Sequence, residues 1–218
     1  MFLSNFLFAQ DSCNCLKELE NMSEIIKNAK SYQSQLIETK KVEEFLKWKE
    51  SIEQEIKNDE LIDFFCSGYL QKLISFINDK HNQVYISHPD PISNAPTYSK
   101  TIDTLQTIND LISGIYYAGE DKVFVKRENE HLWFGVSINQ NSENWPEGKI
   151  RFKIQKDSNG NLEIFEFFNN GMLFFKKILL LKMVEFLQHF GIKTISIISI
   201  KILTRISPTN LSTHLLII

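Results

Sequence analysis

Cysteine is scarce in this chain, and its spacing argues against a structural zinc site. The three cysteines are Cys13, Cys15 and Cys66, with no Cys-x-x-Cys pair and no histidine at a supporting interval. We therefore expect no metal, and no motif indicates a bound cofactor. Cys13 and Cys15 are too close to pair comfortably with each other, so a disulfide would join one of them to Cys66. The alternative is three reduced thiols, with Cys66 buried as a small apolar side chain.

Long apolar runs and basic clusters are also missing. No uninterrupted run approaches the roughly 18 apolar residues that a membrane-spanning helix needs, so no membrane span is expected. Lysine and arginine total 24 against 27 acidic side chains, and the basic ones are not clustered. Binding that depends on neutralising phosphates needs such a cluster. The sequence therefore argues against a nucleic-acid partner.

At 218 residues the chain exceeds the usual size of one domain, and its 43% hydrophobic composition is ordinary for a globular protein.

Residues 1–10 resemble the end of a signal peptide, because they are apolar and finish in a small residue, although a basic start is missing. We interpret them as a truncated signal segment with cleavage near Ala9 or Gln10, which predicts a secreted or periplasmic protein. The alternative is a frayed apolar end that packs on the core.

Residues 11–88 are predicted to form a three-helix bundle. Apolar residues recur at steps of three and four along 14–31, along 39–57, and along a stretch that starts at Asp59 and ends at Asp79-Lys80-His81. Short polar links between these stretches favour antiparallel packing. The apolar stripe of the third stretch is wide, which predicts a core helix, and a short strand is expected directly after it.

Three prolines between residues 89 and 96 forbid a regular helix, and 89–110 is predicted to be a linker. From 111 to 168 the apolar period changes to two, which indicates a five-stranded antiparallel β meander. Asn159-Gly160 is its strongest hairpin signal. The expected strands are 112–118, 122–127, 131–138, 148–155 and 162–167. The predicted fold class is therefore α+β.

Acidic residues almost vanish near the end of the sequence. Residues 171–218 hold ten isoleucines, nine leucines and six basic side chains, whereas Glu185 is their only acid. A stable domain needs local preference, polar placement and core volume to agree. We therefore interpret 169–218 as an atypical apolar tail, read out of frame after about Asn170, that does not pack as part of the fold. The alternative is a genuine hydrophobic helix and strand.

A helix that ends in Asp79-x-His81 and leads at once into a strand resembles the N-terminal helical region of the tail-specific, or C-terminal processing, family of serine peptidases. The likeness covers roughly 13 to 168. Further segments that resemble secreted bacterial members of the family are Cys13-Asn14-Cys15, Cys66, Gly114-Ile115-Tyr116 and Trp145-Pro146-Glu147-Gly148.

The resemblance implies a polypeptide substrate and a later domain in which a lysine-activated serine attacks the peptide bond. We find no match to that domain: no serine lies in a glycine-flanked turn, and Ser196 and Ser199 lie in an apolar run. The expected function is therefore that of a non-catalytic N-terminal region of a secreted peptidase-like protein. The alternative is a β module on a helical bundle that binds a ligand or peptide without catalysis.

His81 and Asp79 are the candidate site residues. His81 follows Asp79 by two residues at the expected helix end, where it is placed to orient or polarise a group in a cleft beside a protease domain. The structural alternative is a histidine that caps the helix and is satisfied by Asp79 or a backbone carbonyl. A metal site built from His81, His88 and Asp90 matches no known ligand spacing.

Overall fold

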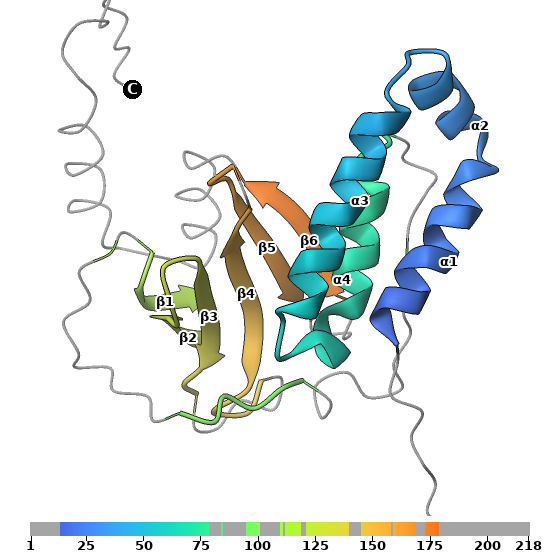
Figure 1. Ribbon diagram of the computed structural model, residues 1–218. Helices are drawn as coiled ribbons and strands as arrows, with labels where there is room; N and C mark the ends of the chain where they lie inside the picture. The colour runs from blue at the N-terminus through green and yellow to red at the C-terminus, as the bar shows by residue number, and fades with distance from the viewer. Residues whose placement is uncertain are drawn as a thin grey trace, which may run out of the picture.

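The computed structural model describes residues 14–78, 84, 95–100, 110, 112–118, 121–139, 145–157, 159–168 and 173–178. Helical elements come first and strands follow, so the α+β class is confirmed (Figure 1). The helical elements are α1 (Cys15–Lys27), α2 (Lys30–Tyr32), the π-helical turn η1 (Gln33–Ile37), α3 (Val42–Lys57) and α4 (Ile62–Ile74). The strands are β1 (Gly114–Ala118), β2 (Asp121–Arg127), β3 (Leu132–Ser137), β4 (Ile150–Lys156), β5 (Leu162–Phe167) and β6 (Leu173–Ile178).

The number of helices differs from the predicted three-helix bundle. The expected helix over 14–31 ends at Lys27, and the polar link that should follow is itself helical, as α2 and η1. Tyr32 and Leu36 explain the difference, because these two side chains, four residues apart, are both buried in the core. The turn is wide enough for the N–H of Lys41 to reach the carbonyl of Leu36 at 2.8 Å.

The central helix is shorter than predicted. We expected it to run from Asp59 to the Asp79-x-His81 corner, but α4 ends at Ile74, where the hydroxyl of Ser75 donates to the carbonyl of Lys72 at 2.7 Å. Such a local side-chain bond competes with continuation of the helix. Asp79, His81, His88 and Asp90 lie outside the described residues, as does most of the strand expected after them.

Helix α4 is the core helix that its wide apolar stripe predicted. It contacts α1, α3 and β6, and nine of its thirteen residues are buried. Figure 1 shows the helices gathered beside β5 and β6, at the end of the sheet opposite β1. A helix buried on most of its circumference belongs in the interior of a protein. Helix α4 therefore lies between the other helices and the sheet.

The strands form one antiparallel sheet in the order β1-β2-β3-β4-β5-β6, so the predicted meander has six strands and not five. Strand β6 comes from the segment interpreted as an unpacked tail. It pairs with β5 from Leu162↔Ile178 to Phe167↔Leu173, and Leu173 is buried, so that interpretation is wrong for 173–178. The sequence of β6, Leu-Phe-Phe-Lys-Lys-Ile, does not alternate between apolar and polar residues, so a period of two could not identify this strand. Residues 179–218 lie outside the described part of the chain.

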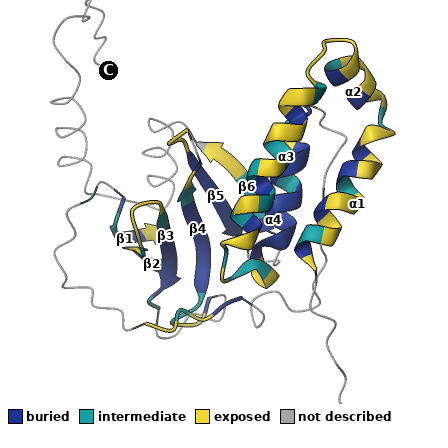
Figure 2. Ribbon diagram, in the orientation of Figure 1, coloured by how far each residue is buried: buried dark blue, intermediate teal, exposed yellow. Residues whose placement is uncertain are grey.

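Both faces of the sheet carry buried apolar side chains: β5 is buried along its whole length and β4 over its first five residues (dark blue in Figure 2). One face packs on the helices through Phe134, Phe165, Phe167 and Leu173. The other carries a second cluster: Ile112, Tyr116, Val123, Val125, Trp133, Phe152, Ile154, Leu162 and Ile164. Strands buried on both faces do not show the one-sided alternation of a surface sheet.

Gly68 sets how closely α4 approaches the sheet. A Cβ at this position would lie 2.4 Å from Cδ1 of Phe165 and 3.0 Å from Cδ2 of Leu173. Phe165 is completely buried, and its ring contacts the rings of Phe65, Tyr69 and Phe175, so it has little room to move. The absence of a side chain at Gly68 is therefore a packing requirement of this helix–sheet contact.

We predict that Gly68→Ala lowers the free energy of unfolding by about 1–2 kcal/mol, because overpacking outweighs the roughly 1 kcal/mol by which alanine favours a helix interior. Chemical denaturation of the variant and the parent measures the difference. Phe165→Leu should relieve the clash, so the double variant should be less destabilised than the sum of the single variants. A gain of stability in Gly68→Ala alone would contradict the prediction.

Candidate functional site

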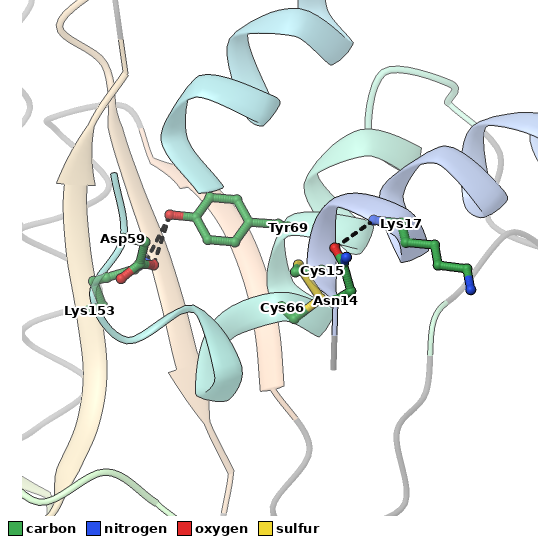
Figure 3. Close-up of a disulfide and its surroundings, with 7 residues drawn as sticks. All are labelled: Asn14, Cys15, Lys17, Asp59, Cys66, Tyr69 and Lys153. Carbon is green, nitrogen blue, oxygen red and sulfur yellow. Dashed lines mark hydrogen bonds and ion pairs between the residues drawn. A yellow bond between two sulfur atoms is a disulfide. The ribbon is translucent and has the colours of Figure 1, made fainter. Parts of the chain in front are cut away.

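A disulfide joins the start of the helical region to α4. Cys15 in the first turn of α1 is bonded to Cys66, with a Cα–Cα distance of 5.5 Å, and both residues are buried (Figure 3). This is one of the two pairings that the sequence allowed; Cys13 lies outside the described residues. With a sequence separation of 51, loop-closure entropy predicts a stabilisation of about 4 kcal/mol.

The other predicted site residues, Asp79 and His81, are not among the residues that the structure describes. Among the described residues, a group of charged and polar side chains connected by hydrogen bonds lies between the helices and the sheet. We call it the interface cluster, and it consists of Glu55, Asp59, Tyr69, Lys72, Lys153, Gln155 and Glu163. These residues come from the end of α3 and the turn after it, from α4, and from β4 and β5. The interface cluster therefore links two helices and the turn between them to two strands.

Lys72 lies at one end of the interface cluster and is completely buried. Its Nζ lies 2.7 and 2.6 Å from the two carboxylate oxygens of Glu55, and it also bonds to Oε2 of Glu163. The amide of Gln155 completes this end by donating to Glu55 at 2.8 Å and to Glu163 at 3.2 Å. Trp48 borders the group, since its ring centroid is 5.2 Å from Nζ of Lys72. One buried cation thus holds a carboxylate from α3 and one from β5.

Lys153 lies at the other end and is 1% exposed. It bonds to Oδ2 of Asp59 and lies 3.0 Å from the hydroxyl of Tyr69, which also lies 3.0 Å from the same carboxylate oxygen (Figure 3). Its Nζ is 4.4 and 4.5 Å from the ring centroids of Phe65 and Phe165, within the range of cation–π attraction. Burial lowers the pKa of Lys153, and the charge and hydrogen bond of Asp59 oppose that shift.

Glu163 is the least satisfied member of the interface cluster. Burial raises the pKa of its carboxyl group, while the charge of Lys72 acts in the opposite direction. Its Oε2 accepts hydrogen bonds, but its Oε1 is buried and has no hydrogen-bond partner. Lys177 lies opposite Glu163 on β6, and burial lowers the pKa of this amine too. The arrangement disfavours charge on both groups relative to solution.

The charged groups of the interface cluster neutralise one another. Its lysines point at carboxylates of the same protein, and its tyrosine hydroxyl bonds within the cluster; burial and the nearby carboxylates raise the pKa of that phenol. Removing two ions from water costs several kcal/mol each, and their attraction repays this only with good geometry. Separating the helices from the sheet would break the ion pairs that cross between the layers, those of Glu163 with Lys72 and of Lys153 with Asp59. The interface cluster therefore fixes how the two layers register.

Sequence reasoning missed the interface cluster, although one signal was present. Lys72 interrupts the apolar stripe of the third predicted helix, between Leu70 and Leu73. Lys153 and Glu163 each stand between apolar neighbours in predicted strands, where alternation alone assigns them to a solvent-facing side. Both are buried because the helices cover that side of the sheet.

The described residues include no helix long and apolar enough to cross a membrane. The same part of the chain has no group of three or more histidine, cysteine, aspartate or glutamate side chains placed to hold a metal ion. Comparison of the chain with protein-family models, with curated proteins and with solved structures gives no match.

Asp157 organises the hairpin between β4 and β5. Its carboxylate accepts the backbone N–H groups of Asn159 and Asn161, both at 2.8 Å, and the side-chain amide of Asn161 at 3.0 Å. Burial opposes its ionisation, but these hydrogen bonds outweigh burial and lower its pKa. Gly160 adopts φ of +80° in the same loop, so the hairpin lies where Asn159-Gly160 predicted it.

We predict that Lys72→Met lowers the free energy of unfolding by about 3–5 kcal/mol, because it leaves two carboxylates facing each other without their cation. Adding Glu163→Gln should recover part of the loss. The control is Lys27→Met, whose exposed ion pair with Glu24 should contribute at most about 1 kcal/mol. Denaturant unfolding of the four proteins provides the measurement. Equal effects of the two lysine substitutions would rule out a special role for Lys72.

We predict that Asp157→Asn destabilises the chain by about 1–2 kcal/mol at pH 7, because the loop loses charge-assisted hydrogen bonds. A depressed pKa contributes stability that is present above the unfolded value, near about 3.9, and is lost as pH falls through the folded value. The difference between parent and variant should therefore shrink below about pH 4. Unfolding measured from pH 7 to pH 3 tests this, and a constant difference would contradict it.

Proposed function

We propose that this chain is a non-catalytic region of a secreted or periplasmic protein that resembles the tail-specific serine peptidases. In this role the helices and sheet form a rigid scaffold beside a protease domain that handles polypeptide. The observation that carries the proposal is the interface cluster. Its acid, base and hydroxyl groups bond to one another and so join α3 and α4 to β4 and β5. In another arrangement the same groups would suit catalysis.

The disulfide supports the proposed location. Structural disulfides persist in oxidising compartments and are rare where thiols are kept reduced. Cys15 and Cys66 are 4% and 5% exposed, so the bridge is shielded from reductants and exchanging thiols. Export would also account for the apolar, signal-like residues 1–10, which lie outside the described part of the chain.

A second candidate function is a β module that binds a peptide without catalysis. The observation that favours it is the outer edge of β1, which has no strand paired to it among the described residues. The two candidates are compatible, since a scaffold in a polypeptide-handling protein can also hold a segment of chain. Different measurements test them: the non-catalytic proposal is tested by assays of proteolysis, and the peptide-binding proposal is tested by assays of binding.

We predict that the purified chain neither degrades unfolded protein nor reacts with a serine-directed fluorophosphonate beyond the level of the heat-denatured chain. Gel-based detection of the labelled protein, together with release of peptides from reduced and alkylated casein, gives the measurement. The matched control is the double variant Ser196→Ala and Ser199→Ala, which should behave like the parent. Labelling or turnover that this variant abolishes would overturn the non-catalytic proposal.

A further inference from the structure

The two edges of the sheet differ in whether a further strand could pair with them, and at the β6 edge a side chain already occupies the backbone groups. The side-chain amide of Gln71, on α4, accepts the N–H of Phe175 at 2.9 Å and donates to the carbonyl of Leu173 at 2.6 Å. These are the groups that a neighbouring strand would use, so Gln71 takes the place of one residue of such a strand. Lys176 and Lys177 add charge to the same edge, which disfavours pairing with another chain.

The β1 edge presents its hydrogen-bonding groups outward. The N–H of Ile138 donates to the carbonyl of Lys122 at 2.9 Å, so the backbone of Lys122 is directed toward β3. The direction of the backbone N–H and C=O groups alternates along a strand, so those of Phe124 also point toward β3. Tyr117 stands opposite Lys122 and Ile115 stands opposite Phe124, and neither pair shares a hydrogen bond. The N–H and C=O groups of Ile115 and Tyr117 therefore point away from the sheet.

The chemistry of β1 suits strand pairing. Its sequence, Gly-Ile-Tyr-Tyr-Ala, has no charge and three residues that favour extended structure. The start of the strand is fixed by Asp110, which accepts the N–H groups of Ile112 and Ser113 at 2.8 and 2.7 Å. The hydroxyl of Tyr116 also donates to the carbonyl of Ile112 at 2.5 Å. An edge held in its binding geometry loses little entropy when a partner docks.

We propose that the β1 edge binds an extended, uncharged segment of polypeptide by strand addition, with Ile115 and Tyr117 supplying the backbone hydrogen bonds. The proposal rests on the proposed function, because it names the part of the scaffold that contacts polypeptide. Extended backbone is the ligand whose donors and acceptors match this spacing. A five-residue strand covers much less than the roughly 1,200 Å² of a stable interface, so the partner is a transiently held segment and not a permanent subunit.

The test uses the full chain labelled with ¹⁵N and a capped synthetic peptide of alternating threonine and valine with lysine at both ends. At saturating peptide we expect shifted amide signals at Ile115 and Tyr117 and hydrogen exchange slowed at least about tenfold at both amides, since each becomes hydrogen-bonded. The same peptide with an N-methyl group on every residue has no backbone N–H donor on either edge, so it should give neither effect.

Two variants separate the backbone from the side chain at Tyr117. Tyr117→Pro removes the outward N–H, which edge strands tolerate, and should weaken peptide binding at least about tenfold. Tyr117→Thr keeps the N–H and should bind within about threefold of the parent. Their melting temperatures establish that both are folded. If Tyr117→Pro does not fold, Ile115→Pro, which removes the other outward N–H, provides the same test.

Several results would overturn the proposal. These are equal binding of the N-methylated peptide, shifts confined to residues outside β1, and no shift at about 1 mM peptide, a concentration that detects weak strand addition. Slow exchange at both amides before peptide is added would mean that the edge is already occupied, and would also overturn it. None of these results affects reaction with the serine-directed probe, so the two proposals fail separately.

Discussion

Two lysines buried between the helices and the sheet are the constraint on which the rest of this structure depends. Lys72 and Lys153 each need a carboxylate within hydrogen-bonding distance, and those carboxylates come from different segments. Glu55 and Asp59 stand at the end of α3 and just after it, whereas Glu163 stands on β5. An apolar contact tolerates sliding of one layer over another, but a buried ion pair does not. The charges therefore select one register among those that hydrophobic burial alone would allow.

Helix α4 is where these ties meet. Within seven residues Cys66 is bonded to α1, Gly68 admits the ring of Phe165, Gln71 pairs with β6, and Lys72 binds carboxylates from α3 and β5. Each position serves a different neighbour because successive residues of a helix point about 100° apart. The helix is buried on almost every side as a result. A single substitution in α4 is therefore expected to disturb the contact with one particular neighbouring helix or strand.

Periodicity predicted much of this fold because it depends on local spacing. The steps of three and four located α1, α3 and α4, and the period of two located β5 at 162–167 and its neighbours within a few residues. It failed where burial came from another layer. Lys153 and Glu163 occupy positions that an isolated sheet would expose, and Leu173–Ile178 lies in a segment whose overall composition is atypical. The interface cluster was missed because its members are up to 108 residues apart in sequence, from Glu55 to Glu163.

The side-chain amide of Gln71 has a consequence for the order in which the chain can be completed. Its partners on β6 lie 102 and 104 residues later, and the partner of Lys72 on β5 lies 91 residues later. At about 5–20 residues per second, synthesis leaves α4 without these partners for several seconds. Cys15 precedes Cys66, so the disulfide can form during that interval, whereas the sheet cannot be finished. The disulfide can thus hold α1 over part of α4 before the strands that cover the rest of the apolar surface of α4 have been synthesised.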